Sequence, residues 1–419
     1  MKLGLICINA PGHLNPMTAL ARQLQSRNHE VIFLYSSEAA GLPVFPQKQQ
    51  SAEQDTTKKA IAEVSKMQGE DALQFGVKAI MGFTESILTS LPAVVAETGV
   101  EALLIDSGHF YVELGAIALG IPYIHVSNAM HSDYSGYTPL CFYDWPHQHT
   151  AEAFARNREG VAKFERIMQR NRTGIESYAE RAGLRVDWAD LWSTLSPLAS
   201  ITQVPRAFDF ESSHLPTQFH HTGPFHDGMG RAKVDFPWDR LTGEPLIYAS
   251  MGTVLNGNLA VFQTIVTALA KRNDRQLVLS VGNWIDPQQI VSAPKNAIIV
   301  QRAPQLELLK LASVCITHAG LNTVLESLAQ GVPQVAIPVT FDQPGVAARI
   351  AHRETGVVTS LDKLTPDHLS ELLDEVLINS TYRANAKKLQ RKIVEANGLA
   401  VAADVVEEAL GVREKPNPL

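Results

Sequence analysis

The chain has 419 residues, more than a single hydrophobic core usually organises, so we expect two domains with a cleft between them rather than one large domain. Its 45% hydrophobic and 19% charged residues, without a biased tract, are typical of a globular protein and exclude a largely disordered one. The net charge of -7 and the absence of Lys/Arg blocks disfavour nucleic acid and anionic membrane surfaces as partners.

The cysteines and the first residues indicate the compartment. Cys7, Cys141 and Cys315 are few, odd in number and far apart, which suits a reducing cytosol. Pro11 and Gly12 interrupt the first apolar run before a signal-peptide core would be complete, so we interpret this run as a buried strand. We find no run of ~18 uncharged apolar residues of the kind that spans a membrane. We therefore expect a soluble, cytoplasmic protein without stable membrane insertion.

The first part of the chain alternates between strand and helix patterns. Leu3–Ile8 is a continuous apolar run, and Asn15 and Pro16 have the residue types of an N-cap and a first helical residue, which predicts a helix from Pro16. The further predictions are strands at 31–35, 102–105 and 121–126 and a helix at 111–119 closed by Gly120. This alternation predicts a parallel sheet. Residues 47–71 and 129–200 are irregular and are expected to decorate it.

A second series of elements follows a linker. Residues 222–244 hold four Gly and two Pro and have no sustained periodicity. Beyond them we predict strands at 246–250, 277–281, 297–300, 314–317 and 335–338, and helices at 262–269, from Asn322, and after the cap pair Thr365–Pro366. We therefore expect an N-terminal domain of residues 1–225, a linker of 226–244, a C-terminal domain of 245–412 whose last helices are free to pack back on the first domain, and a tail of 413–419.

The segment 317–323, THAGLNT, joins a predicted strand to a predicted helix. A helix that begins near Asn322 leaves free backbone N–H groups at its amino end, and its dipole favours an anion there. In a doubly wound domain this loop lies at the carboxyl ends of the strands, where ligands bind. His318 and Thr323 add side-chain donors. The segment therefore predicts a phosphate site.

Further polar residues extend this site. Glu326 shares a helix face with Asn322 and Thr323, and its carboxylate can accept hydrogen bonds from both hydroxyls of a ribose. Asp342 and Gln343 follow the next predicted strand, in what we expect to be a loop, and offer a carboxylate and an amide suited to sugar hydroxyls. Phosphate, ribose and sugar together predict a nucleotide-sugar site.

In this order the residues resemble the signature of family 1 (UGT-type) glycosyltransferases, which carries a Pro-Gln, a His-x-Gly-x-Asn-Ser/Thr, a Glu and an Asp-Gln. Here these are Pro304-Gln305, His318 to Thr323, Glu326 and Asp342-Gln343. GHLNP at 12–16 matches the family's amino-terminal catalytic loop, so the resemblance covers almost the whole chain. It implies the α/β GT-B fold, in which two Rossmann-like doubly wound domains face each other across a cleft. The N-terminal domain then binds the acceptor and the C-terminal domain the nucleotide sugar.

The resemblance also implies roles for single residues. His318, Asn322 and Thr323 would hold the diphosphate and Glu326 the ribose, and the Asp342-Gln343 pair points to glucose. The implied donor-binding residues are Ser250, Thr253, Arg302, Ala303, Gln305, His318, Gly320, Asn322, Thr323, Glu326, Asp342 and Gln343. The plant form has Trp at the positions of Arg302 and Leu321, so the chain is closer to bacterial macrolide and zeaxanthin glycosyltransferases. Both UDP and dTDP remain open.

His13 is the candidate general base for transfer to an acceptor hydroxyl. A neutral hydroxyl is a poor nucleophile unless a positioned base takes its proton, and an imidazole with a pKa near neutrality suits that role. Asp106 ends a predicted strand at the same sheet edge and can fix the tautomer of the ring. On residue types alone, His13 would be a loop residue and Asp106 a helix cap. The downstream motif favours the catalytic interpretation.

The acceptor and metal predictions rest on composition. Aromatic residues in the region that caps the cleft in similar enzymes suggest an apolar acceptor site, for which the candidates are Phe83, Tyr134, Tyr137 and Phe142. The sequence has no Asp-x-Asp pair to hold a divalent ion, and its histidines show no convincing metal-ligand spacing. We expect no cofactor and no metal, with the nucleotide sugar as co-substrate and the helix end and His318 neutralising the leaving group.

The sequence therefore predicts an inverting, metal-independent UDP-glycosyltransferase. The expected reaction moves a hexose, glucose by resemblance, to a hydroxyl of a lipophilic small molecule of the phenol (including flavonoid), terpenoid/carotenoid or macrolide type. Two alternatives stay open: a nucleotide-sugar epimerase on the same fold, and a non-catalytic nucleotide-binding partner protein. A dehydrogenase is disfavoured, because no strand is followed by Gly-x-Gly-x-x-Gly. The sequence does not indicate an oligomeric state.

Overall fold

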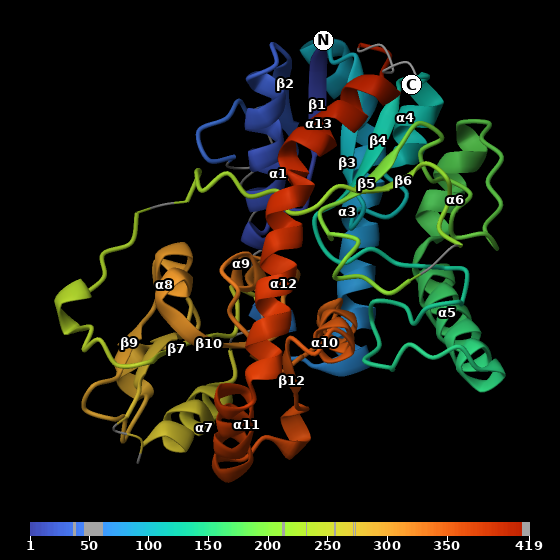
Figure 1. The fold of residues 1–419 in the computed structure, drawn as a ribbon. Coiled ribbons are helices and arrows are strands. Elements are labelled where there is room, and N and C mark those ends of the chain that lie inside the picture. Colours follow the sequence, from blue (N-terminus) through green and yellow to red (C-terminus); the bar gives the residue numbers. More distant parts are fainter. Residues whose placement is uncertain are drawn as a thin grey trace, which may run out of the picture.

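The computed structural model describes residues 1–36, 39–45, 62–211, 214–231, 233–254, 257–270, 272 and 274–412. The predicted tail 413–419 and most of the polar segment 47–71 lie outside these ranges. Within them the chain forms two α/β halves, one above the other in Figure 1, each built on its own sheet. The predicted architecture of two doubly wound α/β halves is confirmed.

The N-terminal sheet has six parallel strands in the order β2-β1-β3-β4-β5-β6. Their bounds are β1 Lys2–Ile6, β2 Glu30–Leu34, β3 Ala102–Asp106, β4 Tyr123–Ser127, β5 Ser200–Thr202 and β6 Phe219–His221. The four longer strands were predicted, and β5 and β6 were not. Strands buried on both faces read as apolar runs, which made the longer ones visible in the sequence.

The C-terminal sheet also has six parallel strands, in the order β12-β11-β10-β7-β8-β9. Their bounds are β7 Leu246–Ser250, β8 Gln276–Ser280, β9 Ile298–Val300, β10 Ala312–Thr317, β11 Gln334–Ala336 and β12 Gly356–Val358. The order reverses between β10 and β7, and the carboxyl ends of both strands meet there. Ligands bind at such a switch point in open α/β sheets.

Helices pack against both sheets. The N-terminal half carries α1 Pro11–Gln25, α3 Gly69–Thr98, α4 Glu113–Leu119, α5 Ala151–Asn171 and α6 Thr173–Arg181. The C-terminal half begins with α7 Leu259–Leu269, α8 Gln305–Leu311, α9 Leu321–Ala329, α10 Gln343–His352 and α11 Pro366–Ile378. Short 3₁₀ turns lie at Trp238–Arg240, Pro287–Gln289 and Leu361–Lys363. The Thr365–Pro366 start of α11 is confirmed, since the Thr365 hydroxyl accepts from the backbone N–H of His368.

The start of α1 differs from the prediction. The helix begins at Pro11, with Ala10 as its extended N-cap, and Pro16 lies inside it. Proline is favoured in the first turn of a helix, and the helix starts at the earlier of the two prolines, Pro11. Pro16 cannot donate a backbone hydrogen bond to the carbonyl of Gly12, one turn earlier, so that carbonyl needs another partner. His13 is therefore a residue of the first helical turn and not of a loop before the helix.

The 30-residue helix α3 was not predicted. Its apolar residues surround much of the helix, it includes Pro92, and it ends at Gly99 in the left-handed conformation. By length and composition it could cross a membrane, which is weak evidence because core helices pass the same test. Its buried face packs against α4, α5 and α6, and Leu73, Val77, Met81 and Leu88 join one cluster with residues of those helices.

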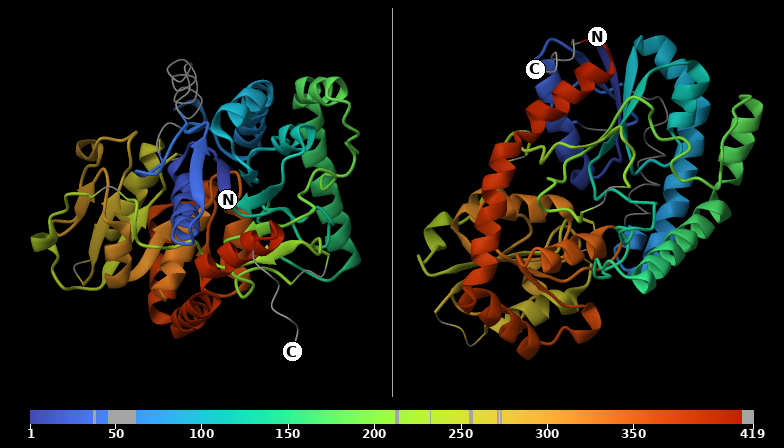
Figure 2. Two further views of the ribbon diagram at one scale, coloured as in Figure 1. Left: turned by 90° about the horizontal axis from the view of Figure 1, so that it is seen from above. Right: turned by 45° about the vertical axis from the view of Figure 1, so that its right-hand side comes forward.

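The chain crosses between the halves twice. The first crossing is the irregular segment 222–244, and the second is α12 (Ser380–Ala396), which leads to α13 (Gly398–Ala409) on the N-terminal half (Figure 2, right). α13 packs on α1, and its Ala402, Ala403 and Val406 are buried in the N-terminal core. A Cβ on Gly398 would collide with the backbone of Gly223, so the two crossings touch. α13 thus packs with the N-terminal core although it follows the C-terminal sheet along the chain.

Candidate active site

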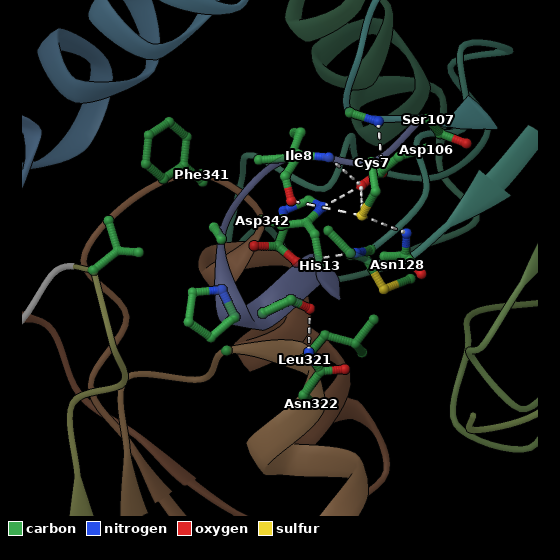
Figure 3. Close-up of a pocket in the computed structure, with 18 of the residues that line it drawn as sticks. Cys7, Ile8, His13, Asp106, Ser107, Asn128, Leu321, Asn322, Phe341 and Asp342 are labelled. Carbon is green, nitrogen blue, oxygen red and sulfur yellow. Dashed lines mark hydrogen bonds and ion pairs between the residues drawn. The ribbon is translucent and has the colours of Figure 1, made fainter. Parts of the chain in front are cut away.

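A cavity of about 1110 Å³ lies between the halves and is lined by residues of both. His13, Asp106 and several residues of α3 line its N-terminal side, and His318, Glu326 and neighbouring loops line its C-terminal side. Figure 3 shows His13 of α1 close to Asp106 and Asp342, with Leu321 and Asn322 at the start of α9 nearby. The structure thus brings the two predicted groups of residues into one cavity.

His13 and Asp106 form a close pair. The His13 Nδ1 atom lies 2.7 Å from Asp106 Oδ2, and Asp106 is 1% exposed at the end of β3. The backbone N–H groups of Ile8 and Gly108 donate to the same carboxylate at 3.3 and 3.1 Å. When Nδ1–H donates to Asp106, the lone pair of Nε2 is the basic site of the neutral ring.

Burial and charge act in opposite directions on this pair. Burial raises the pKa of Asp106, but the His13 charge and the hydrogen bonds from His13 and Gly108 outweigh it, so the pKa lies well below its ordinary value. Burial lowers the pKa of His13, but the attraction and hydrogen bond of Asp106, with a smaller contribution from Asp342, raise it above 6.5 overall. Asp106 therefore stays ionised and stabilises an imidazolium at position 13.

Asp342 approaches His13 from the other half. It is the N-cap residue of α10, and its Oδ2 accepts from the backbone N–H of Met130 at 2.9 Å. Burial raises its pKa above the ordinary value, although the Met130 N–H and His13 lower it. Gln343 is the first residue of α10, and its Oε1 accepts from the backbone N–H of Val339 and Thr340 at 2.8 and 3.2 Å. The pair predicted to lie in a loop therefore opens a helix.

His318 lies between two glycines at the end of β10. A Cβ on Gly252, which has φ +77°, or on Gly320 would collide with its ring. Burial lowers the pKa of His318 to about 4, and its Nδ1 has no partner. The ring is therefore neutral near pH 7 and offers an N–H donor rather than a positive charge. We expected His318 to neutralise the leaving group; a neutral ring can donate a hydrogen bond to that group but cannot neutralise its charge.

Asn322 connects the two halves directly. Its Nδ2 donates to the Gly12 carbonyl, the group that Pro16 leaves without its helical partner, and its Oδ1 accepts from Gln203 Nε2 at 2.8 Å. The side chain is thus engaged by the N-terminal half. The first N–H groups of α9 have no intrahelical acceptor and remain suited to an anion. Gly320, the N-cap of α9, also lines the cavity.

Glu326 already has protein partners. Arg231 of the linker holds it through both guanidinium Nη atoms, and Gln305 Nε2 donates to its Oε2 at 2.6 Å. Gln305 also approaches Thr323 Oγ1 at 3.3 Å and accepts from Tyr248 OH at 3.0 Å. The structure therefore joins three predicted donor residues in one network. Arg231 was not predicted as part of this site, because no local sequence pattern indicates that an isolated arginine pairs with Glu326, 95 residues further along the chain.

The other predicted donor residues lie around the same side of the cavity. Ser250 ends β7, and its Oγ accepts from the backbone N–H of Gly252 at 3.3 Å. Thr253 and Arg302 are exposed at the rim, where Arg302 Nε donates to Asn283 Oδ1 at 3.2 Å, and Ala303 also lines the cavity. Trp284, which sequence reasoning missed, is 41% exposed beside them.

The predicted acceptor residues divide into two groups. Phe83, Tyr134 and Phe142 line the cavity. Tyr137 is not among its lining residues; it is 41% exposed and its ring stacks on His214. Phe83 belongs to α3, and Tyr134 and Phe142 to the segment 129–145; that they bind the acceptor stays a prediction, and aromatic content alone could not show that Tyr137 lies outside the cavity.

A buried ionic cluster joins the halves away from the pair at His13. Among the described residues, His131, Asp209 and His221 are the only group of three whose ligand atoms could reach one metal ion. Arg349 Nε of α10 donates to Asp209 Oδ1 at 2.7 Å, and both residues are 2% exposed. Burial raises the pKa of Asp209, but Arg349 and His131 lower it well below its ordinary value. The countercharge thus comes from the protein, and the cluster ties α10 to the N-terminal half.

Comparison with known proteins agrees with this geometry. Residues 240–395 match the family described as UDP-glucoronosyl and UDP-glucosyl transferase. The chain is 29% identical over 331 residues to a zeaxanthin glucosyltransferase of Pantoea ananas, covering 78% of this chain and 76% of that protein. A zeaxanthin glucosyltransferase of Pseudescherichia vulneris is 28% identical over 417 residues, 96% of each chain.

The C-terminal half of the chain thus matches the UDP-glycosyltransferase family model, and the whole chain is similar to bacterial zeaxanthin glucosyltransferases. This confirms the resemblance carried by the His318 to Gln343 motif, and the chain is accordingly a glycosyltransferase. The solved structure of the glycotransferase of kitacinnamycin superposes with a TM-score of 0.72 at 23% identity and covers 97% of this chain and 98% of that chain. This likeness shows that the glycosyltransferase has the GT-B fold.

Proposed function

We propose that the glycosyltransferase moves glucose from UDP-glucose to a hydroxyl of a lipophilic small molecule, with inversion at the anomeric carbon. The observation that carries this proposal is the His13–Asp106 pair at 2.7 Å, in one cavity with the amino end of α9. A general base on one side of the cavity and a site for the leaving diphosphate on the other are the arrangement that a single displacement requires. The acceptor oxygen attacks C1 while the bond from C1 to the diphosphate oxygen breaks, and one displacement inverts the configuration once.

The proton of the acceptor hydroxyl goes to His13. Its Nε2 carries the lone pair when Nδ1–H faces Asp106, and the ionised carboxylate stabilises the imidazolium formed in the transition state. The raised pKa of His13 makes the ring a stronger base than a free imidazole. The same shift keeps part of the His13 population protonated, and inactive as a base, at acidic pH.

The departing diphosphate takes the electron pair of the broken bond. The first N–H groups of α9 and a neutral His318 N–H would stabilise it, and for this reason we propose that transfer needs no metal or other cofactor. Glu326 would accept the ribose hydroxyls in exchange for its bonds to Arg231 and Gln305. The indole of Trp284 and the guanidinium of Arg302 are flat groups against which the uracil ring of the donor can stack.

The acceptor side is the basis for a lipophilic substrate. Phe83 and Tyr134 line it together with further apolar groups such as Ile80, Met168 and Trp192. Two relatives are named zeaxanthin glucosyltransferases, and zeaxanthin is an apolar alcohol. We propose a phenol, flavonoid, carotenoid or macrolide as acceptor class.

Product analysis tests the proposal. The enzyme is incubated with UDP-glucose, UDP-galactose or dTDP-glucose and a panel of these acceptors, with and without EDTA, and products are identified by mass and by the NMR coupling of the anomeric proton. We expect a β-glucoside from UDP-glucose, formed equally with EDTA. An α-glucoside would refute inversion. A new epimer from UDP-glucose without any acceptor would instead support the epimerase alternative, and nucleotide binding without any product the non-catalytic one.

A further inference from the structure

The N-terminal side of the cavity contains polar groups that the proposed transfer does not use. Glu113, the first residue of α4, is 5% exposed and lines the cavity. Its Oε1 accepts from Thr194 Oγ1 at 2.5 Å, but its Oε2 has no hydrogen-bond partner. Burying a carboxylate oxygen without a hydrogen-bond donor costs free energy, so a ligand that donates a hydrogen bond to this atom would be stabilised.

His125 forms a long ion-pair contact with Glu113 Oε2, but not a hydrogen bond. His125 Nδ1 accepts from the backbone N–H of Ser196 at 3.1 Å, so in the neutral ring the proton is on Nε2. That Nε2 lies 3.6 Å from Glu113 Oε2, beyond hydrogen-bond distance. His125 thus faces the carboxylate without satisfying it.

His109 offers a second unused acceptor beside the pair formed by His13 and Asp106. It is 8% exposed and lines the same cavity. The backbone of Cys7 hydrogen-bonds its ring, while Nδ1 has no partner. Burial lowers the pKa of His109, so the ring is neutral and Nδ1 carries a lone pair. His109 is close enough to His13, Asp106 and Glu113 for their charges to act on it.

A third acceptor strengthens the pattern. Asn128 is 1% exposed and lines the cavity, and its Oδ1 is also without a partner. Glu113, His109 and Asn128 thus line one cavity, and each has one buried acceptor atom without a hydrogen-bond partner, so a ligand that supplies hydrogen-bond donors fits this part of the cavity better than a purely apolar one. A purely apolar group there would leave all three unpaired.

We propose that His109 and Glu113 form a second recognition site in the acceptor pocket, in which one of the two side chains accepts a hydrogen bond from an O–H group of the acceptor other than the one glycosylated at His13. The preferred acceptor is then a lipophilic molecule with at least two hydroxyl groups. This inference rests on the proposed acceptor class and deepens it. Asn128 Oδ1 is a further acceptor, suited to another O–H group of the same molecule.

The test compares matched acceptors by binding, so that it does not depend on turnover. Isothermal titration calorimetry in the presence of UDP measures para-phenylphenol against para,para′-biphenol, and para-hydroxystilbene against its para,para′-dihydroxy counterpart. We expect at least one diol to bind about 10-fold more tightly than its monohydroxy analogue, since the bond it adds is to a buried charged or polar acceptor. Equal affinities within both pairs would overturn the proposal and indicate that water satisfies these atoms.

Two variants locate the effect. Glu113→Gln replaces the Oε2 acceptor by an amide of the same shape, and His109→Leu removes the Nδ1 lone pair. The variant that removes the accepting side chain should reduce the diol preference several-fold, while monohydroxy affinity stays within about twofold in both. His147→Gln is the control, because the nitrogens of His147 are likewise unpartnered but do not line the cavity. A diol preference that persists in both variants would contradict the assignment. Transfer assays run in parallel: absence of transfer alongside a diol preference would refute the proposed function alone.

Discussion

The two sides of the cavity differ in how their polar groups are satisfied. On the donor side, Glu326 and Asn322 already have protein partners, among them Arg231 and Gln203. On the acceptor side, Glu113 and its neighbours keep unpaired acceptor atoms. At Glu326 and Asn322 donor binding must therefore exchange existing hydrogen bonds, and His318 and the first N–H groups of α9 are available to add new ones, whereas acceptor binding at Glu113 and its neighbours adds new ones. We expect donor affinity to be modest and acceptor discrimination to depend strongly on polar groups.

His13→Ala should give the largest effect and should separate the two sides of the cavity most clearly, because it affects transfer and not UDP binding. Without the base, transfer should fall about 1,000-fold, within the usual range for loss of a general base, while the dissociation constant for UDP stays nearly constant because the donor contacts lie on the other side. Steady-state kinetics and calorimetry measure the two quantities. His149→Ala, at an exposed histidine, is the matched control. Unchanged turnover in His13→Ala would refute the base assignment.

Asp106→Asn should have an intermediate effect with a distinct pH signature. The carboxylate raises the pKa of His13, so the wild-type rate should rise with pH through a value above 6.5. Removing the charge lowers that pKa, and the acidic limb of the kcat profile should move to lower pH. The plateau should fall about 10- to 100-fold, because the ring loses its orienting partner. An acidic limb that stays in place would show that another group titrates.

Gly252→Ala should have the smallest effect and act on the donor side. The new methyl group would push the His318 ring, so we expect the UDP dissociation constant to rise about 10-fold and the chemical step to change little. Gly243→Ala is the control: Gly243 has φ +83° but open space around its Cβ position. Both variants should lose about 1 kcal/mol of stability through backbone strain. Equal UDP affinity in the two variants would remove His318 from the diphosphate site.

The sequence predicted the donor side better than the acceptor side. Residues 317–326 are contiguous on one strand, loop and helix, so their spacing alone places them together. His109 and Glu113 meet His13 only through the order of the parallel strands, and whether a buried atom lacks a partner is a property of packing. The three-residue strands β5 and β6 are too short for a periodic pattern, and α3 has no narrow apolar stripe.

The contact between Gly223 and Gly398 has a mechanical consequence. Because a Cβ at Gly398 would collide with the backbone of Gly223, and one at Gly223 would collide with the Cβ of Ala396, a larger residue at either position would have to push the two chain crossings apart. A single cut in the linker would not separate the halves, since α13 remains buried in the N-terminal core. We therefore expect that two separately expressed fragments, cut in the linker, assemble because α13 of the C-terminal fragment packs into the core of the N-terminal fragment.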